Sequence, residues 1–184
     1  KYDNIHLHID GVQDFGKTDI FKPELVDLYS FSGHKIHAPK GVGGLYIDSD
    51  IRIKNIIYGS SQERGIRPGT ENVPGIIGLG KAVEVLQESS EKVIQLKKML
   101  LNGIKERIDG VKWNGPKMPN GSPYILNVSF SELKGEMLVH SLEEDGIYVS
   151  TGSACHSRDS GPSHVVKSIG VDPEYIEGTI RFSF

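Results

Sequence analysis

The sequence lacks a second cysteine, a long hydrophobic run and an excess of charge of one sign. A single cysteine, Cys155, cannot form an internal disulfide, which favours a reducing, cytoplasmic setting. The net charge of −3 over 184 residues gives no reason to expect binding to nucleic acid or to an anionic membrane. No apolar run approaches the roughly 20 residues that a membrane-spanning helix needs, and the first residues do not resemble a signal peptide.

The order of patterns in the first half predicts an α/β arrangement. Apolar and polar residues alternate from Ile5 to Asp10, which is typical of a strand, and further strands are expected in 28–33 and 42–48. A short helical turn is expected at 23–27, between the first two strands. This rhythm favours a mainly parallel sheet. Because strand character begins near Ile5, without an initiating Met, we expect a fragment of a longer chain.

The second half has a different organisation. Apolar residues recur every three or four positions from Val73 to Ile108, so a long helical region is expected there, with a break near Ser89. We place a domain boundary at this break, giving domains 1–88 and 89–184. Beyond an irregular connector at 111–123, strands are expected at 124–130, 147–151 and 179–184, and helices at 135–146 and 161–170. The second domain is therefore expected to be α+β.

The only cysteine lies in a stretch of small and polar residues, "TGSACHSRDSG". These neighbours supply almost no core volume, and His156 or Arg158 would favour the thiolate form of Cys155. A reactive thiol is one interpretation. A free cysteine placed on the surface by accident is the other.

A second polar island follows the strand expected at 28–33. Ser32, Gly33, His34 and Lys35 come directly at the strand end, which is where α/β sheets place ligands. Small and hydroxyl residues beside a histidine can bind a phosphate, and Lys35 could act as a Schiff-base amine. The alternative is an ordinary solvated lysine.

Asp10 ends the first expected strand, where a carboxylate needs a cation or hydrogen-bond donors as partners. A protonated pyridine nitrogen would be one such partner. A competing interpretation is a metal site, because His6, His8 and Asp10 have the His-x-His-x-Asp spacing of some two-metal hydrolases. The next residue is Gly11, and the other histidines form no second ligand pair with a recognisable spacing, so no metal is expected.

Arg181 lies in the last expected strand, "TIRFSF", between apolar residues. A guanidinium in that position is suited to a bidentate contact with a carboxylate. It could equally belong to a structural ion pair.

The order of these stretches along the chain resembles that of cysteine desulfurases of the NifS/IscS type. These belong to the class V aminotransferase group of fold-type I pyridoxal-phosphate enzymes. The matching stretches span the chain and are "HIDGVQDFGK", "SFSGHKIHAPKGVGGLYI", "GIRPGTENV", "STGSACHS" and "TIRFSF". The resemblance implies the C-terminal half of such a chain. Residues 1–88 would be part of the large domain, with a mostly parallel sheet and helices, and residues 89–184 the small α+β domain with the cysteine loop.

The resemblance also implies which residues hold pyridoxal 5'-phosphate. Lys35 would hold it as a covalent aldimine and move protons at the substrate carbons. Asp10 would keep the pyridine nitrogen protonated, and Gln13 would donate to the ring's phenolic oxygen. Ser32 and His34 would bind the phosphate.

Three further residues receive roles from the resemblance. Thr70 would reach the phosphate of the other subunit of a homodimer, and Arg181 would hold the substrate carboxylate. Cys155 would take sulfur from L-cysteine as a persulfide, leave alanine, and pass the sulfur to an acceptor protein, for iron–sulfur cluster assembly or tRNA thiolation. A loop at 151–161 with few apolar anchors suits a thiol that moves between two partners.

Two alternatives remain open at this stage. A selenocysteine lyase has the same architecture and a similar cysteine loop. A truncated, non-catalytic partner of a complete desulfurase would explain why the first half of the family chain is absent. One position also departs from the family, since Asp14 follows Gln13 where a small residue is usual.

Overall fold

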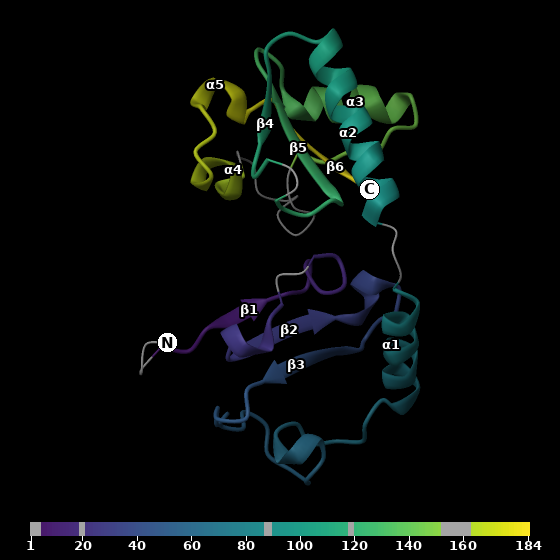
Figure 1. The fold of residues 1–184 in the computed structure, drawn as a ribbon, viewed down its shortest axis with the longest axis vertical. Coiled ribbons are helices and arrows are strands. Elements are labelled where there is room, and N and C mark those ends of the chain that lie inside the picture. Colours follow the sequence, from purple (N-terminus) through teal and green to yellow (C-terminus); the bar gives the residue numbers. More distant parts are fainter. Residues whose placement is uncertain (1–4, 19–20, 87–89, 118–119, 152–162) are drawn as a thin grey trace. The chain divides into compact units, whose positions relative to one another are not determined.

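The computed structural model describes residues 5–18, 21–86, 90–117, 120–151 and 163–184. The chain forms two compact units, Lys1–Glu88 and Ser89–Phe184 (Figure 1). Each unit has its own sheet and its own hydrophobic cluster. None of the helices in the described ranges has the length and apolarity required to cross a membrane.

The sheet of the first unit contains the three expected strands, β1 (His8–Asp10), β2 (Leu28–Ser32) and β3 (Gly43–Ile47), in the order β1-β2-β3. β1 and β2 are parallel, and the register places Asp10 opposite Ser30. β2 and β3 are antiparallel, with Ser32 opposite Gly43, whereas the sequence favoured a mainly parallel arrangement. Residues 33–42 are too few for the crossover that a parallel neighbour requires, so the chain turns back on itself.

Short helical turns and one longer helix complete the first unit. The turns are η1 (Pro23–Leu25), η2 (Gly33–Ile36) and η3 (Glu63–Gly65), and the helix is α1 (Val73–Val85). The Asn72 side chain caps α1 by accepting a hydrogen bond from the Gly75 N–H at 3.2 Å. A small core forms where Ile36, Ala38 and Ala82 pack together, with Phe15, Leu79 and Leu86 against them.

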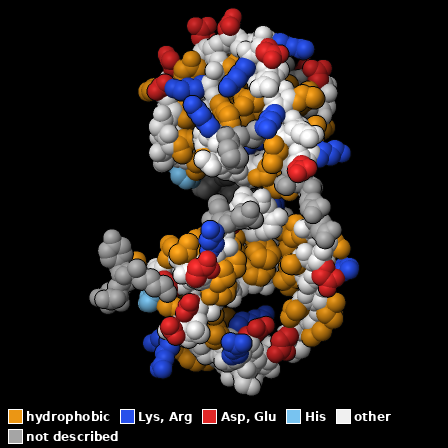
Figure 2. All heavy atoms as spheres, viewed as in Figure 1, with side chains coloured by type: hydrophobic (Ala, Val, Ile, Leu, Met, Phe, Trp, Pro, Cys, Tyr) orange, Lys and Arg blue, Asp and Glu red, His pale blue; other side chains and the backbone are white. Residues whose placement is uncertain are grey.

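Hydrophobic side chains remain on the surface of the first unit (Figure 2). Five of them lie on α1, namely Val73, Ile76, Ile77, Val83 and Val85. A further group, Ile56, Ile57 and Tyr58, lies in the segment before η3, and Ile56 is 92% exposed. Apolar surface of this kind is typical of a region that another part of a protein or a partner covers.

The second unit is built on an antiparallel sheet, as the α+β expectation requires. Its strands are β4 (Val111–Asn114), β5 (Ile125–Phe130) and β6 (Thr179–Ser183), in the order β4-β5-β6. The helices are α2 (Ser90–Arg107), α3 (Gly135–Glu144), α4 (His164–Ser168) and α5 (Pro173–Ile176). Since α1 ends at Val85 and α2 begins at Ser90, the expected break in the long helical region is confirmed.

Three local expectations differ from the structure of this unit. β4 forms in the segment that was expected to be irregular, because only four residues alternate before Gly115 and the strand depends on pairing with β5. α5 was not expected at all. The strand expected at 147–151 is reduced to a single bridge between Ser150 and Arg181.

The two faces of the second sheet have opposite character. One face carries Leu126, Val128, Phe130 and Ile180, which form the core together with Leu101 of α2. The other face is polar and carries a hydrogen-bonded row across the three strands. Its members are Asn114, Asn127, Ser129 and Thr179, at distances of 2.7, 2.6 and 2.6 Å for Asn114–Asn127, Asn114–Ser129 and Ser129–Thr179. Arg181 lies on this polar face, directly opposite Asn127.

Candidate active site

The residues expected to hold a ligand gather at one edge of the first sheet. Asp10 is the last residue of β1, and Ser32 is the last residue of β2. Because the two strands are parallel and paired, their carboxyl ends lie at the same edge. η2 starts there directly after Ser32 and carries His34 and Lys35. Ligands of α/β sheets bind at this kind of edge.

Ser32 and His34 form the most closely defined contact of the edge. The Ser32 Oγ and the His34 Nδ1 lie 2.8 Å apart. The imidazole is exposed, and the serine is half-buried. Gly33 between them is buried, and a Cβ at this position would lie 3.0 Å from the Val42 carbonyl oxygen. Gly33 therefore allows the turn to pack closely against the backbone at Val42, and the side chains of Ser32 and His34 remain available for an anion.

Lys35 has a second cation near it that the sequence interpretation did not identify. Lys35 is half-buried in η2. Partial burial, together with the charge of Lys35, lowers the pKa of Lys17. The Lys17 ammonium group is therefore sensitive to the charge of Lys35. The only signal in the sequence was the position of Lys17 at the end of the stretch "HIDGVQDFGK".

Asp10 is available for a ligand. Its Oδ1 accepts a hydrogen bond from the Val12 N–H at 3.1 Å, which fixes the start of the following turn. The side chains of Asp10 and Gln13 are exposed. Within the described ranges Asp10 forms no ion pair, so its carboxylate can accept a cationic partner.

The residues of the His-x-His-x-Asp spacing have separate partners. His6 Nδ1 lies 3.9 Å from an Asp27 oxygen, and His8 Nε2 lies 3.3 Å from the Ser30 Oγ. In the part of the chain that the structure describes, no group of three His, Cys, Asp or Glu side chains could hold a metal ion. The geometry therefore does not favour the metal interpretation over the anion site at the sheet edge.

Thr70 lies away from this edge in sequence, in the loop between η3 and α1. It is exposed, and it precedes the helix cap Asn72 by two residues. The loop is held by the Gln62 side chain, whose Oε1 accepts a hydrogen bond from the Gly69 N–H at 3.2 Å. Thr70 is thus presented on the surface of the first unit.

Arg181 is held on β6 of the second unit with an unused donor. Its backbone N–H donates to the Ser150 carbonyl at 2.6 Å, and the Ser150 N–H donates to the Arg181 carbonyl at 3.2 Å. The Nε atom is buried and has no hydrogen-bond partner among the described residues. Arg181 forms no ion pair with those residues either, so the structural ion pair is not found. A buried guanidinium donor without a partner fits an acidic ligand.

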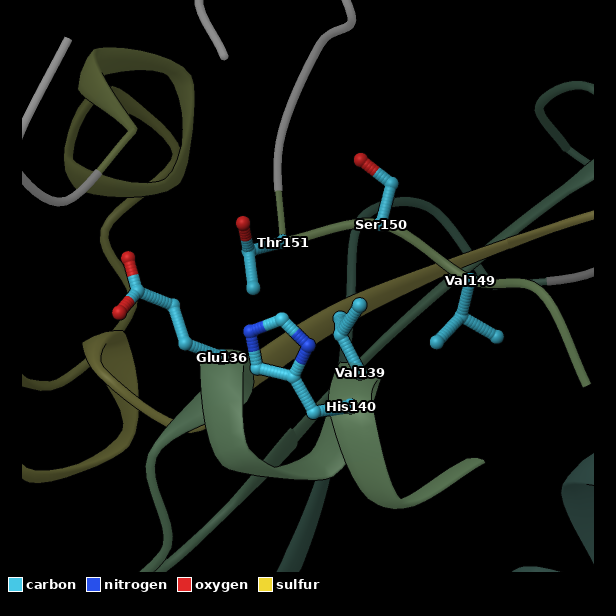
Figure 3. Close-up of a pocket in the computed structure, with 6 residues that line it drawn as sticks. All are labelled: Glu136, Val139, His140, Val149, Ser150 and Thr151. Carbon is cyan, nitrogen blue, oxygen red and sulfur yellow. The ribbon is translucent and has the colours of Figure 1, made fainter. Parts of the chain in front are cut away.

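Cys155 lies in residues 152–162, outside the described residues. Thr151, the last described residue before that segment, lines a depression of about 250 Å³ together with Glu136, Val139, His140, Val149 and Ser150. Figure 3 shows the side chains of Glu136 and His140 projecting from α3 on the side of Thr151. The surface beside Thr151 is therefore hollowed, and its lining mixes polar and apolar side chains.

The chain is similar to known proteins along its whole length. A family model described as aminotransferase class-V matches residues 1–184. The cysteine desulfurase IscS of Clostridium botulinum is 47% identical over 189 residues, which cover 100% of this chain and 48% of the relative.

Two solved structures have the same fold over at least 98% of the chain. A NifS-like protein matches with a TM-score of 0.83 and 37% identity, covering 100% of this chain and 48% of its own. SspA in complex with cysteine matches with a TM-score of 0.74 and 31% identity, covering 98% and 50%. The chain therefore spans about half the length of the relatives it matches.

Proposed function

This chain belongs to the aminotransferase class-V family, and from this premise we propose that it is part of a pyridoxal-phosphate-dependent cysteine desulfurase. The observation that carries the proposal is the gathering of Asp10, Ser32, His34 and Lys35 at the carboxyl edge of β1 and β2. Residues 1–88 would then belong to the cofactor-binding domain. Residues 89–184 would form the small domain that carries the nucleophile.

The residues at this edge fit pyridoxal phosphate. Ser32 and His34 offer a hydroxyl and an imidazole for the phosphate from one short turn. Lys35 offers a half-buried amine for covalent attachment. The Asp10 carboxylate has no ion-pair partner among the described residues and suits a protonated ring nitrogen. Gln13, exposed on the turn after β1, can donate to the ring oxygen.

When bound, the cofactor supplies an electron sink for charge that develops at the substrate's α-carbon. The chain's own residues hold and move protons. Asp10 would keep a proton on the ring nitrogen and so maintain the sink. The Lys35 amine would take the proton from the α-carbon and return protons to the substrate carbons. Arg181 binds the substrate carboxylate through donors such as its unpartnered Nε.

Cys155 would accept the sulfur atom of the substrate. Its thiolate attacks the sulfur of L-cysteine, a sulfur–sulfur bond forms, and the carbon–sulfur bond of the substrate breaks. The electron pair of that bond stays with the substrate carbon, which takes up a proton. L-cysteine and one thiol thus yield alanine and one persulfide, with no external oxidant. The cysteine named in the solved SspA complex supports this substrate class.

The partners form part of the same proposal. We propose a homodimer in which Thr70 reaches the phosphate site of the other subunit. Thr70 is exposed, and the hydrophobic residues Ile56, Ile57 and Tyr58 are exposed in the segment that leads to it, which supports a covered surface there. The persulfide would pass to an acceptor protein of iron–sulfur cluster assembly or tRNA thiolation in a reducing cytoplasm.

The attachment lysine gives the sharpest test. The native-length protein is loaded with pyridoxal phosphate and reduced with borohydride, and the labelled peptide is mapped. The label is expected on Lys35, to be lost in Lys35→Ala and to remain in Lys40→Ala, whose lysine is exposed close by in the same motif. A label on another lysine overturns the site. A protein that stays colourless with cofactor supports the non-catalytic partner instead.

The thiol is tested separately with alanine as the measured product. Cys155→Ser is expected to abolish persulfide and alanine formation from L-cysteine while the bound cofactor keeps its visible absorbance. Absence of alanine from a wild-type protein that holds the cofactor overturns the desulfurase assignment. If Cys155→Ser releases selenium from selenocysteine at the wild-type rate and fails only with cysteine, the selenocysteine lyase is the better description.

A further inference from the structure

A buried tyrosine supports the turn that follows β1. Tyr29 of β2 is only 1% exposed, and its hydroxyl donates to Asp14 Oδ2 at 2.8 Å. The same hydroxyl lies 3.4 Å from the Gly11 carbonyl oxygen. The backbone at Gly11 rests against the ring so closely that a Cβ there would lie 1.9 Å from Tyr29 Cζ. The start of the turn therefore packs directly against the Tyr29 side chain.

Asp14 closes the turn from its other end. Its second carboxylate oxygen accepts a hydrogen bond from the Thr18 hydroxyl, and its backbone N–H donates to the Gly11 carbonyl at 2.9 Å. The carboxylate thus takes one donor from the turn and one from β2. A serine or alanine at this position does not reach both, which gives a physical reason for the acidic residue that departs from the family pattern.

The tyrosine is held in the form that donates. An ordinary phenol is already protonated at physiological pH, and burial and the hydrogen bond to Asp14 raise the pKa of Tyr29 further, which extends the donating form to more alkaline pH. The other contacts of the turn are of a different kind. The Gly11 N–H donates to the Ser30 carbonyl at 2.8 Å, and the ring of Phe15 stacks on Phe31 at a centroid distance of 4.2 Å.

The turn adjoins Asp10 and contains Gln13, two residues of the proposed cofactor site. Asp10 immediately precedes Gly11, and Gln13 immediately precedes Asp14. Ser32 and Lys35 follow Tyr29 on β2 and η2. Tyr29 therefore connects the two halves of the edge, because its backbone lies in β2 and its hydroxyl holds the turn after β1.

We propose that the Tyr29–Asp14 hydrogen bond is a positioning device that keeps Asp10 and Gln13 in register with Ser32 and Lys35 at the cofactor site. The inference rests on the proposed function. Neither Tyr29 nor Asp14 is a catalytic residue, since both act through the turn that they hold.

Tyr29→Phe isolates the hydroxyl because the ring that supports Gly11 is kept. The matched control is Tyr46→Phe on β3, where Tyr46 lies directly opposite Tyr29 and its exposed hydroxyl is 3.5 Å from the Pro23 carbonyl. In the native-length protein without cofactor, amide hydrogen exchange of residues 11–18 is expected to be about tenfold faster in Tyr29→Phe, from the loss of one hydrogen bond to a charged group. Tyr46→Phe should leave these amides unchanged.

Affinity for pyridoxal phosphate gives the second readout. Tyr29→Phe and Asp14→Ser are expected to bind about tenfold more weakly than wild type, and Tyr46→Phe as wild type. Asp14→Asn keeps an acceptor for the tyrosine and should recover part of the loss, which a general decrease in stability would not predict. Asp14→Ser also preserves the test if Tyr29→Phe does not fold.

The outcomes separate this inference from the proposed function. If wild type binds the cofactor, and Tyr29→Phe and Tyr46→Phe match in both exchange and affinity, the positioning role is wrong and the desulfurase proposal stands. If wild type does not bind the cofactor, the proposed function is wrong and the cofactor part of this inference falls with it. In that case the exchange experiment still decides whether the hydrogen bond holds the turn.

Discussion

Replacing Arg181 with methionine separates a ligand-binding arginine from a structural one. The Nε of Arg181 is buried without a hydrogen-bond partner among the described residues, and the side chain has no ion pair with them. Methionine has a similar length and no donor. The change should therefore remove contacts to substrate while leaving the contacts within the described structure almost intact.

The structure sets the expected magnitudes. A guanidinium that binds a carboxylate side-on makes two charge-assisted hydrogen bonds. Losing both costs about 3 kcal/mol of substrate binding, which raises KM for L-cysteine roughly a hundredfold. A buried donor without a partner costs the folded state about 1–3 kcal/mol, so Arg181→Met should leave the free energy of unfolding unchanged or raise it. Arg181→Lys keeps the positive charge but cannot make two parallel hydrogen bonds to a carboxylate, so KM should rise about tenfold.

The assay measures alanine formation as a function of L-cysteine concentration, with urea unfolding of the same preparations. Arg107→Met at the end of α2 is the matched control, because Arg107 is exposed in the same unit. The control should keep the wild-type KM. An Arg181→Met variant with unchanged KM, or with stability lowered as for a broken ion pair, refutes the assignment of this guanidinium to the substrate carboxylate.

Three further predictions concern stability. The pKa of Tyr29 is raised above the ordinary 10.0, so the contribution of its protonated phenol to the free energy of unfolding is complete below pH 10.0 and is lost as the pH rises through the folded-state pKa. In urea unfolding, the stability of Tyr29→Phe should therefore decrease less at alkaline pH than that of wild type. Leu126 is 0% exposed in the core, and Leu126→Ala should cost about 2–5 kcal/mol by urea unfolding, against less than about 1 kcal/mol for Ile125→Ala at the partly exposed start of β5. Gly11→Ala forces a Cβ against the Tyr29 ring and should cost about 1–3 kcal/mol, and an unchanged melting temperature would contradict the contact.

Local signals were sufficient for the elements that depend on neighbours in the chain. The apolar repeat predicted the helical region that forms α1 and α2, and the stop at Gly146 agrees with its φ of 76° just beyond α3. β4 was missed because its four residues acquire strand geometry from pairing with β5. The antiparallel pairing of β3 likewise depends on the length of its connection to β2 and not on the pattern within the strand.

The residues of the candidate site also differ in whether a local sequence signal points to them. Asp10, Ser32, His34 and Lys35 could be proposed from the sequence because they stand at a strand end or directly after one and together follow a specific motif order. Lys17 was missed because nothing in its local pattern distinguishes it from a solvated lysine, and its relation to Lys35 is spatial.

Residues a few positions apart are enough to establish the order of the chemical groups along the chain, the helical region from Val73 onward and the alternation that makes strands, whereas the short helix α5 could not be recognised from them. The parallel pairing of β1 and β2 agrees with the sequence prediction, but the fold was needed to show the register that brings Asp10 to the edge that holds Lys35 and the antiparallel return of β3. The tertiary structure also placed Tyr29 beneath Gly11, with its hydroxyl on Asp14, and left the Arg181 Nε without a partner among the described residues. The physical reason is that burial, pairing and an unused donor are properties of contacts between segments distant in sequence, and such contacts exist only once the chain has folded.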